Sequence, residues 1–434
     1  MRVSTNTVYE QGVSNMLRNQ AQMLRTQEQI STSRRIVTPA DDPVAAARVL
    51  ELSQSRAVTE QFDRNGQFAQ GAIGQQEQAL QRYTRLLQDV KTMAVGAGNA
   101  ALGASDRTSL ASELRGRYEE LLSIANTTDA NGLYLFSGYQ GTTQPFAETA
   151  AGVVAYSGDD GSRLIQIGPS RDIPVSHPGS DVFVRIPTGN GTFATAAAAA
   201  NTGSGLVSPG TVRDASAWNS AGNPGNFDIR FHVNSTVSPA TTTYDIVDTV
   251  NNVSLLTGAA PASGPHLRTY TTGTTISLAR QSPPDTNPVA FDYGIDLSVS
   301  GSPATGDVFT VAPSTSQDVF ATVYGLITAL ESAGTGTTLN TRFTNLRNTA
   351  LSNLDNALTV NLTAVSAIGA RAGEIDTARE TAGDASLQFD KTLSSLQDLD
   401  YASALSQLTQ QKVSLEAAQK SFIQVQQLSL FQYL

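Results

Sequence analysis

Cysteine is absent from this 434-residue chain. The chain therefore forms no disulfide and has neither a catalytic thiolate nor a cysteine-ligated metal. Lysine is missing between Lys91 and Lys391, and glutamate is missing between Glu148 and Glu331. Charged residues make up only 15% of the chain, which is a low share. We attribute this low share to extra surface that is buried against other subunits.

Features of nucleic-acid-binding and membrane proteins are also missing. The formal net charge is −10, whereas nucleic acids and anionic membranes attract clustered lysine and arginine. The N-terminal MRVSTNTVYEQGVSN has no charged start followed by an apolar run of about 7–15 residues, so we expect no general secretory signal. The longest apolar run, from Ala194 to Ala200 with Thr195 inside it, is far too short to span a membrane. We predict neither nucleic-acid binding nor membrane insertion.

The sequence contains no recognisable catalytic arrangement. His177, His232 and His266 lie far apart, without the spacing of a shared metal site. Phosphate-binding G-x-x-x-x-G-K and nucleophile G-x-S-x-G motifs do not occur. Asp159 and Asp160 could bind calcium, but the run GDDG is favoured as a hairpin turn between VVAYS and RLIQI. We predict that the chain is not an enzyme and has no cofactor and no metal.

The central part of the chain differs in composition from both ends. Of the 17 prolines, 15 lie from Pro145 to Pro313, and Trp218 and all the histidines lie there too. Residues 186–304 are rich in Thr, Ser, Gly, Pro and Asn and carry short alternating runs such as FDIRFHV, TTTYDIV and FDYGIDLSV. Such runs between turn-forming residues predict an all-β insertion.

Both ends of the chain carry apolar residues every seven positions, which is typical of paired helices. An N-terminal helix is predicted over about residues 8–35, with Met16, Met23, Ile30 and Val37 in its stripe. The last helix has a stripe of Leu408, Leu415 and Phe422 and a companion row of Ala404, Ala418 and Val425. Half of the N-terminal seam is polar, because Gln20 and Gln27 occupy companion positions. A seam of this kind is weak alone and needs partners.

A second pair of helices is predicted inside the first. Asp42 and Pro43 mark the start of one helix, as N-cap and first helical residue. Gly66, Gly71 and Gly74 leave two lengths open for it, since each costs about 1 kcal/mol in a helix interior. Its stripe is Ile73, Leu80, Leu87 and Ala94, and the partner over about residues 340–395 has the rows Leu351, Leu358, Val365, Ala372 and Leu354, Asn361, Ile368, Ile375.

These patterns predict an α+β multidomain fold in which long terminal helices pair as a coiled-coil-like bundle and a central all-β insertion projects from it. Four domains are expected. They are residues 1–40 with 400–434 as a terminal helical assembly domain, 41–140 with 318–399 as a helical bundle, 141–185 with 305–317 as a small β domain, and 186–304 as an exposed inserted β domain.

Heptad stripes occur both in ordinary cores and in contacts between subunits. The half-polar terminal seams and the nearly uncharged end SLFQYL favour a contact between subunits. A chain whose first and last helices meet can repeat head to tail and form a ring or a helical layer. The predicted assembly interface consists of Met16, Met23, Ile30, Leu408, Leu415, Phe422 and Val425.

Several stretches resemble the flagellin superfamily. They are MRVSTNTVYEQGVSN, STSRRIVTPADDPVAAA, DRTSLASELRGRYEELLSIANTTDANGLYLFSGYQGTTQPF and the terminal SFIQVQQLSLFQYL. The start MRVST and the run LYLFSGYQGTTQPF are more typical of the branch of hook–filament junction proteins. The resemblance covers about residues 1–185 and 305–434, and residues 186–306 carry no motif of the family.

This resemblance implies a structural subunit of the bacterial flagellum that joins the hook-side junction to the flagellin filament. It implies export by the flagellar secretion system and a location at the hook–filament junction. The implied partners are further copies of the chain, a neighbouring hook-associated junction protein, flagellin, and a cytoplasmic export chaperone at the C-terminal helix.

Two other interpretations remain open from the residues. One is a filament flagellin of the same superfamily, which would polymerise into long filaments instead of a short layer. The other is a surface adhesin whose insert binds glycan, with Trp218, Tyr244 and Tyr270 as stacking candidates. Aromatic residues in short β-runs are more often core residues than ligand platforms.

Overall fold

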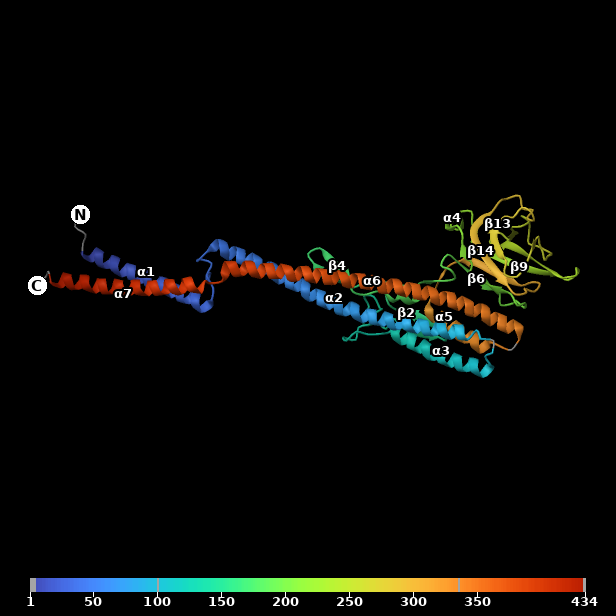
Figure 1. Cartoon of the computed structure of the whole chain (residues 1–434), viewed down its shortest axis with the longest axis horizontal. Coiled ribbons are helices and arrows are strands. Elements are labelled where there is room, and N and C mark those ends of the chain that lie inside the picture. The colour runs from blue at the N-terminus through green and yellow to red at the C-terminus, as the bar shows by residue number, and fades with distance from the viewer. Residues whose placement is uncertain (1–4, 100, 335, 432–434) are drawn as a thin grey trace. The chain divides into compact units, whose positions relative to one another are not determined.

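The structure is a computed structural model that describes residues 5–99, 101–334 and 336–431. The chain forms two compact units (Figure 1). Unit 1 contains residues 1–67, 166–171 and 375–434, and unit 2 contains residues 68–165 and 172–374. The predicted α+β fold class, with long terminal helices and a central β-rich region, is confirmed.

The helices are long and lie at both ends of the sequence. They are α1 (Thr5–Thr32), α2 (Pro43–Gly96), α3 (Ala104–Ala125), α4 (Ala215–Trp218), α5 (Val319–Ser332), α6 (Thr337–Gln397) and α7 (Tyr401–Phe431), with a π-helical turn η1 (Ser180–Val184). The glycines inside α2 do not interrupt it. The burial of Ile73, Leu80 and Leu87 therefore outweighs the low helix propensity of these glycines.

The strands lie between α3 and α5. They are β1 (Phe146–Ala150), β2 (Val153–Tyr156), β3 (Leu164–Gly168), β4 (Arg171–Pro174), β5 (Ile186–Pro187), β6 (Phe193–Ala197), β7 (Leu206–Val207), β8 (Thr211–Val212), β9 (Phe227–Asn234), β10 (Thr241–Asp248), β11 (Val253–Ser254), β12 (Arg268–Thr269), β13 (Thr275–Ala279), β14 (Asp292–Ser300), β15 (Val308–Pro313) and β16 (Ser316–Gln317).

The inserted β domain has two sheets around one core. The larger sheet has the order β11-β10-β9-β15-β6, with β12 also paired to β10, and the smaller one has the order β13-β14-β7, with β8 also paired to β14. Along β9 the burial alternates, so that Phe227, Ile229 and Phe231 point into the core. Because β15 pairs with β9 and β6, this strand belongs to the sheet of the insert. The limits of the four predicted domains otherwise remain a prediction.

Asparagines on α6 hold the insert through its backbone. Asn345 accepts from Val207 N at 3.1 Å and donates to Gly205 O at 3.0 Å. About three helical turns along, Asn356 donates to Pro187 O at 2.7 Å and Gly189 O at 2.9 Å. These amides fix the position of the insert against α6 within unit 2.

An aromatic cluster forms the centre of the helical part of unit 2. Phe183 of η1 is fully buried, and its ring centroid lies 4.7 Å from Tyr83 of α2, 5.1 Å from Phe136 and 5.3 Å from Phe146 of β1. Phe320 of α5 completes the cluster at 6.3 Å. Phe136 and Phe146 belong to the run LYLFSGYQGTTQPF, so this sequence motif supplies core residues.

The predicted hairpin around GDDG is wrong. Strand β2 pairs with β1, and β3 pairs with β4. The two aspartates hold the intervening loop to other segments instead. Asp159 accepts from Tyr139 N at 3.0 Å, while Asp160 accepts from Ser180 Oγ and pairs with Arg185.

The aromatic residues proposed to stack on glycan lie mainly in the core. Trp218 and Tyr244 are each only 5% exposed and belong to the apolar cluster inside the insert. Tyr270 packs against the same cluster, and its hydroxyl donates to Val299 O and Gly301 O. A buried ring face cannot stack on a sugar, and the structure does not favour the adhesin interpretation.

Candidate assembly interface

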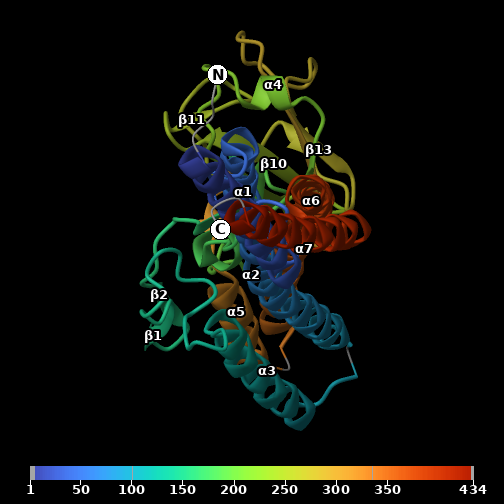
Figure 2. The same ribbon diagram turned by 90° about the vertical axis from the view of Figure 1, so that its left-hand side faces the viewer.

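The first and last helices form an antiparallel pair within unit 1. Helices α1 and α7 lie side by side in both ribbon views (Figure 1, Figure 2). At one end, the Tyr9 and Phe422 rings have centroids 5.3 Å apart. At the other end, the Tyr401 hydroxyl donates to Ile30 O at 3.4 Å. The two ends of the sequence therefore meet, as the matching heptad stripes predict.

The predicted interface residues lie where the two helices face each other, which we call the seam. Met16, Met23 and Ile30 on α1 and Leu408, Leu415 and Phe422 on α7 are all half-buried. The seventh residue, Val425, lies in α7, but its side chain is outside the described part of the structure. The stripe thus forms the intramolecular contact, and part of its surface still faces solvent. Its role between subunits stays a prediction.

The seam is weakly packed and partly polar. A Cβ atom at Gly12 would lie 3.0 Å from the Phe422 ring, so a larger residue there would require the ring to shift. In the middle of the seam the Oε1 atom of Gln411 is buried, with no hydrogen-bond partner among the described residues. A buried acceptor without a partner costs about 1–3 kcal/mol. The α1–α7 pair is therefore less stable than the apolar core of unit 2.

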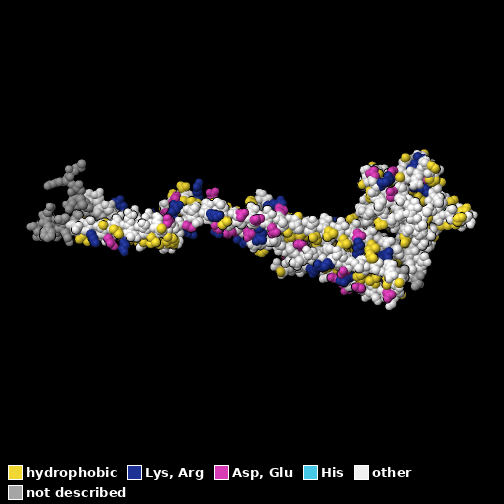
Figure 3. Space-filling view, viewed as in Figure 1, with side chains coloured by type: hydrophobic (Ala, Val, Ile, Leu, Met, Phe, Trp, Pro, Cys, Tyr) yellow, Lys and Arg dark blue, Asp and Glu magenta, His cyan; other side chains and the backbone are white. Residues whose placement is uncertain are grey.

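Two rows of apolar side chains on this pair face solvent. The rows consist of Tyr9, Leu17 and Leu24 on α1 and Leu405, Val413 and Ile423 on α7, with exposed fractions of 48%, 60%, 55%, 52%, 61% and 53%. We call them the exposed rows. Hydrophobic side chains are visible along this pair in the space-filling view (Figure 3). Isolated exposed leucines are normal, but repeated ones on one helix pair mark an interaction surface.

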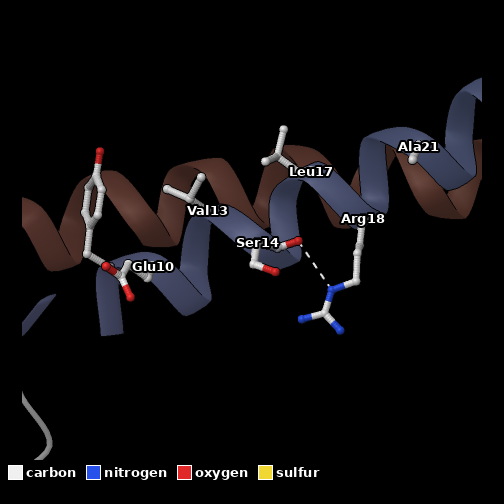
Figure 4. A pocket seen from close by; sticks show the side chains of 7 residues that line it. Glu10, Val13, Ser14, Leu17, Arg18 and Ala21 are labelled. Atoms are coloured by element: carbon white, nitrogen blue, oxygen red, sulfur yellow. Dashed lines mark hydrogen bonds between the residues drawn. The ribbon is translucent and has the colours of Figure 1, made fainter. Parts of the chain in front are cut away.

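A shallow groove accompanies the row on α1 (Figure 4). It is lined by Tyr9, Glu10, Val13, Ser14, Leu17, Arg18 and Ala21. Arg18 is held beside it, because its guanidinium donates to Ser14 O at 3.3 Å and to Asn15 Oδ1 at 2.8 Å. A second groove on α7 is lined by Leu405, Ser406, Thr409, Gln410 and Val413. The groove on α1 is lined mainly by apolar side chains, whereas polar Ser406, Thr409 and Gln410 lie between Leu405 and Val413 in the groove on α7.

Heptad spacing places Leu17 and Leu24 next to the stripe residues Met16 and Met23, but it does not single out the row on α7. The sequence signal for these rows is a second apolar residue a few positions before or after a stripe residue. Heptad counting selects the residues that pack within the pair, because these repeat most regularly. The residues left on the outside repeat less strictly.

Two other kinds of site, a metal cluster and a membrane-spanning helix, are not found in the described residues. Within residues 5–99, 101–334 and 336–431, no group of three or more His, Cys, Asp or Glu side chains is placed to hold a metal ion. Over the same residues, no helix is both long and apolar enough to cross a membrane.

Comparison with known proteins shows which family this chain resembles. The model of the bacterial flagellin N-terminal helical region matches residues 3–141. The flagellar hook-associated protein 3 of Salmonella typhimurium is 36% identical over 183 residues, which are 42% of this chain and 57% of that protein. The sequence match thus spans little more than half the length of this relative.

Solved structures match over nearly their whole length. The crystal structure of FlgL from Xanthomonas campestris is 30% identical, with a TM-score of 0.62, and the match covers 78% of this chain and 99% of that one. The flagellar hook-associated protein 3 from Legionella pneumophila is 29% identical, with a TM-score of 0.68, over 80% of this chain and 98% of that one.

Proposed function

This chain belongs to the FlgL family of flagellar junction proteins, and from this premise we propose that it is a structural subunit of the bacterial flagellum. In this role it joins the hook-side junction to the flagellin filament. The observation that carries the proposal is the match to FlgL of Xanthomonas campestris over 99% of that chain. A structural role also suits a chain in which the run LYLFSGYQGTTQPF supplies core residues.

We further propose its location and partners. The subunit leaves the cell through the flagellar secretion system and takes its place at the distal end of the hook. Its neighbours there are other copies of itself in a ring or helical layer, a second hook-associated junction protein, and flagellin. The absence of cysteine supports this route, because such a chain crosses between redox compartments without misoxidation.

A strain that lacks this protein tests the proposal directly. We expect the strain to keep its hooks, to shed filament protein into the medium and to be non-motile. A plasmid copy of the full chain should restore attached filaments. Filaments that remain attached in the deletion strain would refute the junction role. Long filaments formed by the purified protein alone would support a filament flagellin instead.

We propose that the α1–α7 pair is the assembly interface and that its two surfaces have different tasks. The seam, with Met16, Met23, Ile30, Leu408, Leu415, Phe422 and Val425, holds the two helices together. The exposed rows then dock on neighbouring subunits, with the apolar row of one chain in the groove of the next. This head-to-tail contact uses two different patches on each chain and therefore repeats into a layer.

Leu17→Asp separates docking from folding. Leu17 is 60% exposed, so the change should alter the free energy of unfolding by no more than about 0.5 kcal/mol. In the assembled layer the new carboxylate would be buried without a partner, and filament attachment should be lost. The matched control is Gln22→Asp, which puts the same charge on the exposed opposite side of α1. Equal attachment by both variants in the complemented deletion strain would exclude the exposed row as a docking surface.

Phe422→Asp tests the seam and the proposed export chaperone together. The Phe422 ring packs on Gly12 and on the Tyr9 ring, and a carboxylate cannot replace these contacts. We propose that a cytoplasmic chaperone covers the same apolar face of α7 before export, as helix-in-groove partners do. The variant should keep unit 2 folded but lose both chaperone capture and filament attachment. Pull-down and attachment assays that both match the unchanged protein would show that this face is only an internal contact.

A further inference from the structure

A pair of histidines lies on the outer face of the larger sheet of the insert. The rings of His232 on β9 and His266 have centroids 6.1 Å apart and meet edge to face, with an interplanar angle of 79°. Side chains alternate along β9, so His232 points away from the apolar core. On β10, Thr243 and Asp245 lie on the same outer face, because Tyr244 between them points into the core. Asp245 is only 3% exposed, so this part of the outer face is covered.

A short segment covers the histidine pair. We call residues 260–267, with the sequence APASGPHL, the flap. Gly264 lies directly on the His232 ring: a Cβ atom there would be 2.4 Å from Cγ of His232, and the φ angle is +108°. The backbone N of His266 donates to Thr243 Oγ1 at 3.0 Å, which is the one hydrogen bond that the flap makes within the described chain. The flap is therefore held mainly by its contacts with the two imidazole rings.

The site beneath the flap suits neutral imidazoles. The Nδ1 atom of His232 is buried, with no hydrogen-bond partner among the described residues, and a Cβ atom at Gly264 would lie 2.7 Å from it. A neutral imidazole carries a proton on one nitrogen only, whereas an imidazolium carries one on both. Protonation of His232 would therefore bury an N–H group that has no acceptor, which is unfavourable. A second positive charge on His266 would lie beside the first.

Charged groups of both neighbouring strands act on the pair. Burial lowers the pKa of His266, and the positive charge of Arg230 on β9 and the neighbouring His232 lower it further, against the attraction of Asp245 on β10. Arg230 is itself paired with Asp228 at 3.0 Å, so this cation stays in place. The surroundings thus favour the neutral form of His266 while the flap is closed.

We propose that the flap is a pH-sensitive switch, closed over His232 and His266 at neutral pH and released from the outer face of the sheet when acid protonates these two side chains. Protonation adds an unpaired N–H group and two charges that repel each other at the place where the flap is attached. Leu267 packs against the core of the insert and anchors the end of the flap. The switch lies wholly within the insert, so it depends neither on the terminal helices nor on the proposed flagellar role.

The direction of the switch follows from the proton on His266. In the open flap this side chain is in water, and its pKa returns to the ordinary value of 6.5. The closed flap, with the lowered pKa, binds the proton less readily and loses stability as the pH falls below about 6.5. Burial raises the pKa of Asp245, whose protonation acts in the opposite sense. Its hydrogen bonds come from Ser254 and Ile246, outside the flap, so opening changes its protonation less.

Spin labelling of the full-length protein tests the proposal. The chain has no cysteine, so a nitroxide can be attached at one site, Ser263→Cys, on an exposed position of the flap. Below about pH 6.5 the ratio of mobile to immobile label should rise by up to about tenfold per pH unit for each proton taken up on opening. A label at Thr275→Cys, exposed on β13, should not change. Unchanged fluorescence of Trp218 would show that the core of the insert stays folded.

Three variants with the flap label complete the test. His232→Gln combined with His266→Gln should remove the pH dependence. His177→Gln is the matched control and should keep it, because burial also lowers the pKa of this histidine but it lies outside the insert. Gly264→Ala should leave the label mobile at every pH, since its Cβ atom would collide with the His232 ring.

Four results would each overturn the proposal. They are a label on the flap whose mobility does not depend on pH, a transition that survives in the double glutamine variant, and a label that stays immobile at neutral pH in Gly264→Ala. The fourth is simultaneous release of the labels at positions 263 and 275 with a change in Trp218 fluorescence, because the whole insert would then unfold instead of the flap alone.

Discussion

Phe183→Ala is expected to lower the free energy of unfolding of unit 2 by about 3–5 kcal/mol, the usual cost of truncating a buried phenylalanine. Phe183 is fully buried and touches the rings of Tyr83, Phe136, Phe146 and Phe320. These rings come from α2, the segment before β1, β1 itself and α5. The cavity left by the missing ring would therefore weaken the packing of four segments at once. The surrounding helices cannot fill this cavity without losing contacts elsewhere.

Chemical denaturation followed by circular dichroism measures this effect, because unit 2 holds α3, α5 and much of α2 and α6. Tyr139→Ala is the control, since Tyr139 is also an aromatic residue near this cluster in sequence but is 65% exposed. It should change stability by no more than about 0.5 kcal/mol. Losses of the same size in both variants would show that Phe183 is not the centre of the core.

Arg268→Met should destabilise the insert by about 3–5 kcal/mol, the typical cost of breaking a buried ion pair. The side chains of Arg268 and Asp285 are 2% and 0% exposed and form two hydrogen bonds, at 3.0 and 2.7 Å. The guanidinium also donates to Ser277 O at 3.1 Å and to Ala279 O at 2.6 Å. Without it, a buried carboxylate and two strand carbonyls lose their partner.

Trp218 gives a direct measurement, because it is the only tryptophan and lies in the core of the insert. Arg213→Ala is the control: its pair with Asp292 is about half exposed and should be worth no more than about 1 kcal/mol. The double variant Arg268→Met with Asp285→Leu should recover much of the loss, because no charge then stays buried alone. A single variant as stable as the control would contradict the assigned role.

The contrast between the two units bears on the proposed function. Unit 2 contains a buried aromatic cluster, the α6 asparagines that hold the insert, and the Arg268–Asp285 pair. The α1–α7 pair of unit 1 has the half-buried seam and the exposed rows instead. This contrast supports the proposal that the subunit completes the packing of its terminal helices against neighbours.

The sequence by itself determined where the helices lie and whether each segment forms helix or strand. Heptads such as Ile73, Leu80 and Leu87 recur locally, and a local period predicts which face of a helix is buried. Alternation in FDIRFHV predicts a strand in the same way. Even the polar Asn361 in an apolar stripe was visible, although its bonds to Leu80 O and Thr84 Oγ1 were not. The motifs that resemble the flagellin superfamily also lie in short continuous runs.

Matching heptads predicted that the first and last helices pair, but tertiary structure alone decided the individual contacts. Strand β2 pairs with β1 and not with β3, because Asp159 and Asp160 bond to distant segments and draw the loop away from a hairpin. The same holds for Arg35, whose guanidinium donates to Leu396 O, 361 residues away. It holds also for Leu17, which heptad spacing places beside the stripe but which the geometry of the α1–α7 pair leaves in solvent. Local periodicity predicts that two helices can pair, but it does not predict individual contacts between residues so far apart in sequence, since these depend on how whole elements pack.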